Sequence, residues 1–212
     1  IDVKTESGSE LIKTAKILIA TGSEPCRLPI KGVDLPHVYN SNEMLEMTEL
    51  MSPLVIIGGG VIGLEFASMY SAFGAQVVVL EAMDRILSNM DRDFAVNLKQ
   101  ILSKRGVEFH TGAEVSEIVK AGFRATTSLE VKFNDKKTGN ETTVPAQAVL
   151  VAVGRRTATE ELFDKNCLPS IPSMDKGRVK VNDRYETDVP GIYAIGDVTG
   201  GIQLAHMASA EG

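Results

Sequence analysis

Residues Leu54 to Glu81 read LVIIGGGVIGLEFASMYSAFGAQVVVLE, and their pattern is the strongest indication of the fold. The first four residues are apolar, as expected of a strand that is buried on both faces of a parallel sheet. Glycines follow at the spacing G-x-G-x-x-G, then a helical segment, and then a second apolar strand that ends at Glu81. This order of strand, glycine-rich turn, helix and strand predicts a βαβ unit.

Each part of this unit suits the binding of a dinucleotide. Gly58 permits a tight turn, Gly60 lets the backbone approach a pyrophosphate, and Gly63 lets the helix pack closely against the strand. The N-terminus of the helix offers free N–H groups and its positive dipole end to the phosphates. Glu81 can accept hydrogen bonds from the 2′-hydroxyl of an adenosine ribose. A charge that merely ends a strand is the alternative for Glu81, but the complete pattern favours ribose binding.

Composition excludes several other classes of protein. The 212 residues are 43% hydrophobic and 24% charged, which is ordinary for a globular protein. The net charge of −6 gives no electrostatic case for binding nucleic acid or a membrane surface, and no apolar run reaches membrane-spanning length. Cys26 and Cys167 are isolated, which favours a reducing cytoplasm, or the mitochondrial matrix in a eukaryote. No histidine has partners at metal-ligand spacing, so we predict no metal site.

The rest of the chain is predicted to surround this unit with short strands and helices. Hydrophobic periodicity and turn residues carry these predictions. The expected elements are strands over 1–5 and 15–20 joined through a turn at Ser7–Ser9, a short helix capped by Ser41, a helix over 94–105, a strand over 107–110, an antiparallel meander over 115–120, 129–133 and 141–144, a buried strand over 147–153, a short helix after Thr157, strands over 179–181 and 192–195, and a helical run over 204–211.

Two further segments carry chemistry. The run Ile17–Ser23 is a buried strand that ends in Thr-Gly, and the run Thr187–Asp197 contains a strand that ends in Gly-Asp. In both, a small residue at the carboxyl end of the strand lets a ligand approach the backbone. Asp197 supplies an acceptor for a polyol or ribose hydroxyl. We interpret Arg155 and Arg156, which follow a predicted strand, as solvated charges.

Six stretches in fixed order resemble the pyridine-nucleotide–disulfide oxidoreductases, and within that family the dihydrolipoamide dehydrogenases. They are ATGSEP (20–25), VIIGGGVIGLEFAS (55–68), VVVLEAMDRIL (77–87), VLVAVGRR (149–156), TDVPGIYAIGDV (187–198) and QLAHMASAEG (203–212). In that family an NAD domain interrupts an FAD domain. The resemblance therefore implies an α/β chain with a Rossmann-like NAD-binding domain over 40–157, made of a parallel sheet and an antiparallel meander. Partial FAD-binding segments over 1–39 and 158–212 flank it.

The resemblance also implies which residues contact the two cofactors. Those expected at NAD are Gly58, Gly59, Gly60, Val61, Ile62, Gly63, Leu64, Glu65, Glu81, Val115 and Gly154. Those expected at FAD are Thr21, Gly22, Ser23, Asp197, Gln203, Leu204, Ala205 and His206.

No catalytic residue is expected within this chain. The family's redox pair has the spacing C-x-x-x-x-C, but Lys31 stands at that distance from Cys26. His206 and Glu211 have the spacing of the family's catalytic dyad. They follow the flavin motif directly, lack its Pro-Thr, and as an i, i+5 pair point to different faces of a helix. Thr157 stands where the family usually has proline, which puts the loop that leaves the NAD domain in doubt.

The implied complete enzyme converts dihydrolipoamide and NAD⁺ to lipoamide and NADH through FAD and a redox disulfide outside this chain. It is expected to be a homodimer whose substrates are the dihydrolipoyl groups of a 2-oxo acid dehydrogenase or glycine cleavage complex. We interpret the chain as a piece of such a protein, inactive by itself. Related flavoenzymes, of the NADH oxidase or mercuric reductase type, and a nucleotide-binding module without catalysis remain alternatives. A short-chain dehydrogenase is excluded because no tyrosine begins a Tyr-x-x-x-Lys motif.

Overall fold

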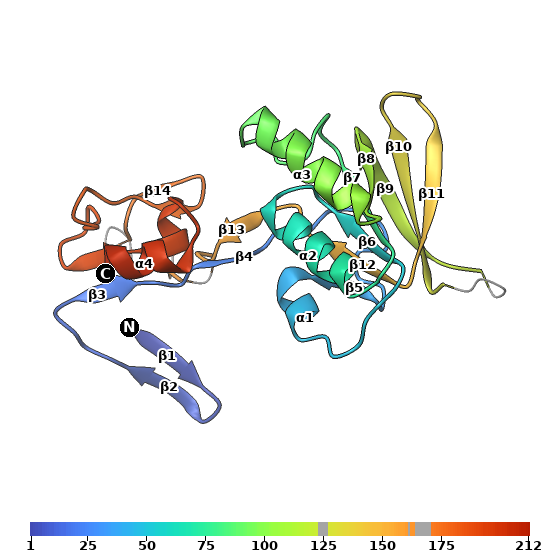
Figure 1. Ribbon diagram of the computed structural model, residues 1–212. Helices are drawn as coiled ribbons and strands as arrows, with labels where there is room; N and C mark the ends of the chain where they lie inside the picture. Colours follow the sequence, from blue (N-terminus) through green and yellow to red (C-terminus); the bar gives the residue numbers. More distant parts are fainter. Residues whose placement is uncertain (123–126, 161, 164–170) are drawn as a thin grey trace. The chain divides into compact units, whose positions relative to one another are not determined.

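The computed structural model describes residues 1–122, 127–160, 162–163 and 171–212, which form two compact units (Figure 1). One unit is the continuous segment Pro25–Gly154, and the other combines Ile1–Glu24 with Arg155–Gly212. Cys167 lies outside the described residues.

The continuous unit is built on a parallel sheet of five strands in the order β5, β12, β6, β7, β8. The sequence prediction of an α/β chain with a parallel sheet is confirmed. The strands are β5 (Val38–Asn40), β12 (Ala148–Val151), β6 (Leu54–Ile57), β7 (Val77–Glu81) and β8 (Glu108–Thr111).

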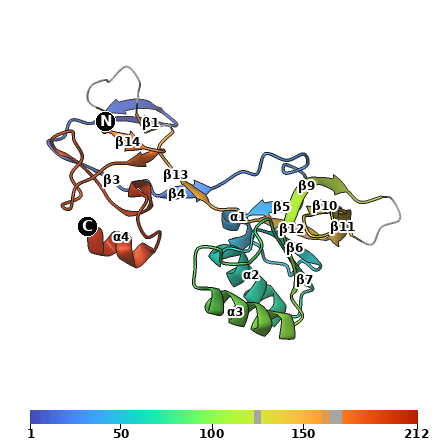
Figure 2. The same cartoon turned by 90° about the horizontal axis from the view of Figure 1, so that it is seen from above.

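Each face of this sheet is covered by a different layer (Figure 2). Leu54 and Ile56 of β6 pack into a cluster with the helices, and Val55 and Ile57 pack into a cluster with an antiparallel meander. Because alternate side chains of a strand point to opposite faces, burial on both faces explains the unbroken apolar run. The covering elements are α1 (Ser41–Leu45), α2 (Val61–Ala72), α3 (Arg92–Lys104), β9 (Ala113–Lys120), β10 (Leu129–Asp135) and β11 (Glu141–Ala146).

The segment 25–39, which the resemblance assigns to the flavin domain, packs with the continuous unit. Leu28, Ile30, Val33 and Leu35 lie against the apolar cluster beneath the meander. The backbone of Lys31 accepts a hydrogen bond from Ile118 of β9 at 2.9 Å. The assignment of each unit to one nucleotide stays a prediction.

The second unit consists of two-stranded pairings, and its described buried core is formed by Ile19, Val179, Ala194 and Val198. Its elements are the hairpin β1 (Asp2–Thr5) and β2 (Gly8–Leu11), the parallel pair β3 (Ile17–Ile19) and β16 (Ile192–Ala194), the pair β4 (Ser23–Pro25) and β13 (Arg155–Thr157), the pair β14 (Met174–Asp175) and β15 (Arg178–Val179), the 3₁₀ helix η2 (Gly196–Thr199) and α4 (Ala205–Glu211).

Two local predictions are wrong. The first strand pairs with β2, which the sequence analysis missed, and the strand expected over 15–20 is only β3. The N-cap of α1 is Asn40 rather than Ser41. Thr157 itself ends the strand β13. The short helix expected after it falls largely outside the described residues, so it stays a prediction.

None of the described helices is both long and apolar enough to cross a membrane.

Candidate nucleotide-binding site

Two of the three motif glycines are required by the fold itself. Gly58 has φ of 115°, and a Cβ there would lie 2.3 Å from the carbonyl oxygen of Ala152 in the neighbouring chain segment. A Cβ on Gly63 would lie 2.2 Å from the carbonyl oxygen of Gly58. A side chain at position 58 would push the turn away from the segment that follows β12, and one at position 63 would push the first turn of α2 away from the end of β6. This agrees with the predicted tight turn and close packing of helix and strand.

Gly60 is different, because nothing in the fold demands a glycine there. Its φ of −80° is open to any residue, and a Cβ would meet no described atom within 4 Å. It is the N-cap of α2, and no side chain of the described residues caps that helix end. No described side chain therefore accepts from the backbone N–H groups of the first turn, which lie at the positive end of the helix dipole. This arrangement suits an anion held close to the backbone.

The carboxylate of Glu81 contacts the backbone of the glycine-rich turn. Its Oε2 accepts a hydrogen bond from the N–H of Gly59 at 2.5 Å, and its Oε1 accepts one from the N–H of Met83 at 2.8 Å. The carboxylate is half-buried and fixed at the carboxyl end of β7. Because each carboxylate oxygen can accept more than one hydrogen bond, Glu81 retains capacity for a hydroxyl donor.

The remaining residues predicted at NAD surround this turn or lie beyond it. Leu64 is buried in the core below α2, and Glu65 is exposed on that helix. Val115 is half-buried in β9, and Gly154, with φ of 126°, follows β12. The structure brings Gly58–Gly63 and Glu81 together. Direct roles for Glu65, Val115 and Gly154 stay predictions.

Two lysines that the sequence analysis missed lie at the same edge of the sheet. The turn between β10 and β11 carries Lys136, whose Nζ donates to the carbonyl oxygen of Ala82 at 3.3 Å, and Lys137, whose Nζ donates to Oγ1 of Thr111 at 3.1 Å. Thr111 is the register partner of Glu81. More than 50 positions separate these lysines from Glu81 in the sequence, so spacing within one motif could not have revealed them.

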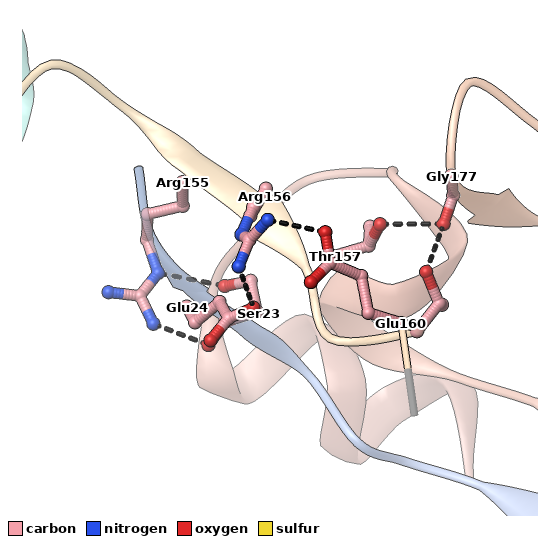
Figure 3. A network of polar contacts seen from close by, with 8 residues as sticks. Ser23, Glu24, Arg155, Arg156, Thr157, Glu160 and Gly177 are labelled. Carbon is pink, nitrogen blue, oxygen red and sulfur yellow. Dashed lines mark hydrogen bonds and ion pairs between the residues drawn. The ribbon is translucent and has the colours of Figure 1, made fainter. Parts of the chain in front are cut away.

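In the other unit, Asp197 belongs to a connected polar network. Ser23 donates its hydroxyl to Oδ2 of Asp197 at 2.5 Å. Arg155 donates from Nε to Oγ of Ser23 at 2.8 Å and from Nη2 to the carbonyl oxygen of Ser23 at 2.7 Å (Figure 3). Asp197 is half-buried at the start of η2. The interpretation of Arg155 as a solvated charge is wrong.

Arg156 is also paired. Its guanidinium contacts the carboxylate of Glu24 at 3.0 Å and that of Glu160 at 2.5 Å, and the three side chains lie together in Figure 3. Nearby, Thr157 and Thr159 both donate to the carbonyl oxygen of Gly177. These contacts join β4, β13 and the loop before β15.

The other residues predicted at FAD are less organised around a common site. Thr21 donates its hydroxyl to the carbonyl oxygen of Ala158 at 2.9 Å, and Gly22 accepts a hydrogen bond from the N–H of Ala158 at 3.0 Å. Gln203, Leu204, Ala205 and His206 are exposed at or before the start of α4.

Glu211 accepts from the N–H of Gly196 at 2.6 Å, so this carboxylate orients the turn next to Asp197.

The described residues contain no group of three or more histidine, cysteine, aspartate or glutamate side chains that could hold a metal ion.

Comparison with known proteins supports the family membership that the sequence motifs indicate. The family model described as pyridine nucleotide-disulphide oxidoreductase matches residues 1–212. The chain is 39% identical to a dihydrolipoyl dehydrogenase of Bacillus subtilis, over all of this chain and 44% of that protein. It is 38% identical to a dihydrolipoyl dehydrogenase of Acholeplasma laidlawii, over 96% of this chain and 57% of that protein.

A solved structure of similar fold is a Cu(II) complex of the HOCl-induced flavoprotein disulfide reductase RclA from Escherichia coli. It has a TM-score of 0.86 and 34% sequence identity, over 99% of this chain and 45% of that one. The chain thus spans about half the length of the relatives that it matches. Its 212 residues belong to the pyridine nucleotide-disulphide oxidoreductase family.

Proposed function

We propose that the unit Pro25–Gly154 is the NAD(H)-binding part of a flavoprotein disulfide oxidoreductase of the dihydrolipoyl dehydrogenase type. The observation that carries the proposal is Gly60, which stands at the uncapped N-terminus of α2 although neither its backbone conformation nor a described neighbour requires a glycine. A pyrophosphate seated against this backbone would provide the missing reason for the glycine. Glu81, held by Gly59 and Met83, would receive the adenosine ribose.

The second unit would contribute to an FAD site. Asp197 has Oδ2 engaged by Ser23, while no described donor contacts its Oδ1, which is available to a hydroxyl of the flavin's polyol chain. Arg155 would hold Ser23, and through it Asp197, in place. Thr21–Ser23 and Gln203–His206 complete the part of the site proposed for this chain.

In the complete protein, bound FAD would relay electrons from a dithiol through a cysteine pair to NAD⁺. The residues of this chain would bind and orient the two nucleotides, and none of them would act as acid, base or nucleophile. The dihydrolipoyl dehydrogenase relatives support lipoyl groups of a 2-oxo acid dehydrogenase or glycine cleavage complex as substrates. We propose that the complete protein is a homodimer in the cytoplasm or the mitochondrial matrix.

A related disulfide reductase with a different substrate is the second candidate. The similarity to the RclA structure, at 34% identity, favours it as well as the first. Assay of the complete protein with dihydrolipoamide and NAD⁺ distinguishes them, because only the first candidate produces NADH from that pair.

Substitution of glycines tests the NAD(H) site directly. Gly60→Ala should leave the free energy of unfolding nearly unchanged, since the new Cβ meets no described atom. It should weaken NADH binding at least tenfold, because the Cβ would occupy the path of the pyrophosphate. Binding is measured by titration calorimetry on the 212-residue chain.

Gly122→Ala is the matched control, because a Cβ on Gly122 would also meet no described atom within 4 Å and Gly122 does not have positive φ. It should leave both stability and NADH affinity unchanged. Equal NADH affinity in the Gly60 variant and the parent chain would refute the proposed site.

A further inference from the structure

The turn that joins β10 to β11 brings two ammonium groups to the edge of the sheet that carries Glu81. Nζ of Lys136 lies 3.3 Å from the carbonyl oxygen of Ala82, the residue directly after Glu81. Nζ of Lys137 lies 3.1 Å from Oγ1 of Thr111, which pairs in register with Glu81 across β7 and β8. Both ammonium groups therefore contact residues that adjoin Glu81, one in the chain and one across the sheet.

The backbone fixes this position of the turn. The N–H of Lys136 donates to the carbonyl oxygen of Gly112 at 2.9 Å. The N–H of Gly112 donates in turn to the carbonyl oxygen of Met83 at 2.7 Å. Gly112 adopts φ of 75°, which a glycine reaches without strain. The N–H of Lys137 donates to the Asp135 carboxylate at 2.7 Å. Lys136 is thus anchored through its main chain to the loop that follows Glu81.

The charged side chains at this edge differ in how freely they could contact a ligand. The guanidinium of Arg85 donates to the carbonyl oxygens of Ser88 and Met90, which directs it into its own loop. Glu114 lies 3.4 Å from the ammonium of Lys136, and the side chains of both are more than half exposed. Lys136 is therefore partly neutralised but accessible to a ligand.

A phosphate on the adenosine 2′-oxygen would meet opposing forces at this edge. The carboxylate of Glu81 would repel it, and a lysine ammonium, which binds phosphate as a point charge, would attract it. Cofactor preference is a difference between two affinities, so both the repulsive and the attractive group contribute to it.

We propose that Lys136, assisted by Lys137, is a second determinant of cofactor choice. This proposal rests on the proposed NAD(H) site. It attracts the 2′-phosphate of NADPH and so limits the preference for NADH that Glu81 creates. Glu114 acts in the opposite direction, because it neutralises Lys136. The role proposed for both lysines concerns only the 2′-phosphate, which NADH lacks.

Titration of the 212-residue chain with NADH and with NADPH at low ionic strength tests this proposal. Lys136→Met should weaken NADPH binding about threefold, the effect of one exposed ion pair, and leave NADH binding unchanged. Glu114→Gln should strengthen NADPH binding by a similar factor. Both effects should largely disappear at about 1 M salt, where the screening length is about 3 Å. Lys104→Met, which removes an exposed lysine at the end of α3, is the control of equal charge and should change neither affinity.

The outcomes separate this proposal from the one on which it rests. If the parent chain binds NADH but Lys136→Met leaves the ratio of NADH to NADPH affinity unchanged, Lys136 is not a determinant and only the present proposal falls. A change of the same size in the Lys104 variant would show a long-range charge effect and would also overturn it. If the parent chain binds neither nucleotide, the proposed site is wrong and this inference falls with it.

Discussion

At the scale of single residues, the carboxylate of Glu81 has two tasks. It fixes the glycine-rich turn by accepting from Gly59 and Met83, and it is proposed to receive the adenosine ribose. The sequence spacing from Gly58 predicted the second task but could not predict the first, because hydrogen bonds to the backbone depend on how the loop after β7 folds back. Lys136 was missed for a similar reason, since only the tertiary fold brings it near Ala82.

The charge of Glu81 leads to a prediction about cofactor preference. The chain should bind NADH at least tenfold more tightly than NADPH, a difference of about 1.4 kcal/mol. Glu81→Gln keeps an acceptor oxygen but removes the repulsion, so the preference should fall toward equality. Titration calorimetry with both cofactors measures it. Asp84→Asn, which removes an exposed charge three residues away, should change the preference less. Equal affinities in the parent chain would contradict the assigned role of Glu81.

The two structural glycines of the motif lead to a prediction about stability. Gly58→Ala should lower the free energy of unfolding by more than about 2 kcal/mol, because it combines strained backbone with a Cβ only 2.3 Å from the oxygen of Ala152. Gly60→Ala should cost less than about 0.5 kcal/mol. Urea unfolding followed by circular dichroism compares them. Similar losses for both variants would show that the motif glycines do not have separate roles.

At the scale of elements, the reliability of sequence prediction follows burial. The strands β6 and β7 and the helix α2 were predicted correctly because their apolar residues record burial within the sheet and below the helix. The strand β2 was missed because its four residues are all exposed and carry no hydrophobic pattern. The cap of α1 was misplaced by one residue, because Asn40 and Ser41 are both good N-cap residues and only backbone geometry separates them.

The capping box of α1 gives a direct test of that correction. The side chain of Asn40 accepts from the N–H groups of Asn42 and Glu43, and the Glu43 carboxylate accepts from the N–H of Asn40. Asn40→Ala should therefore lower the free energy of unfolding by about 1 kcal/mol. Asn42→Ala, a substitution of the same kind at an exposed position in the helix, should cost less. If Asn42→Ala is the more damaging variant in urea unfolding, the assigned cap is wrong.

The meander contains a pH-dependent contribution to stability. Hydrogen bonds from Lys132 and Lys31 lower the pKa of Glu117 below its ordinary value. A carboxyl group with a lower pKa in the folded state stabilises the fold above its unfolded pKa, and the stabilisation disappears as the pH falls through the folded pKa. Glu117→Gln should therefore unfold at lower urea than the parent chain at pH 7, and the difference should shrink below about pH 4.

The partner substitution Lys132→Met should reproduce this pH dependence, because it removes the hydrogen bond that lowers the pKa of Glu117 most. A difference between parent and Glu117→Gln that stays constant from pH 7 to pH 3 would rule out the ion pair as its source.

At the scale of the whole molecule, the two units differ in how they are built. Pro25–Gly154 is continuous and has buried clusters on both faces of its sheet, whereas the other unit joins two distant segments around a core with four buried apolar residues among those described. The sequence motifs identified the family, and the assignment of 25–39 to the flavin segments stays a prediction. Leu28, Ile30, Val33 and Leu35 pack beneath the meander, a contact that no local pattern in the sequence encodes.

This difference in construction predicts unequal protection from hydrogen exchange. The amides of β6 and β7 should exchange slowly, since both strands are buried and have partners on each side. Those of β1, β2 and β3 should exchange much faster, since their sheets have only two strands and expose both edges. Mass spectrometry on the 212-residue chain measures both. Equal protection in a monomer would show that the smaller core is as stable as the larger one.

The residues present also predict what the 212-residue chain can do by itself. Its sequence has one G-x-G-x-x-G motif, assigned to NAD, and its two cysteines do not have the C-x-x-x-x-C spacing. On the flavin side, Thr21 already uses its hydroxyl on Ala158, so Asp197 and a few exposed groups must offset the entropy lost when FAD is held. We therefore expect a colourless preparation that binds NADH but does not reduce NAD⁺ with dihydrolipoamide. Absorbance near 450 nm measures bound flavin, and absorbance at 340 nm measures NADH production. Stoichiometric flavin or dithiol-dependent NADH production would show that the flavin-binding contacts of this chain suffice without any other part of the protein.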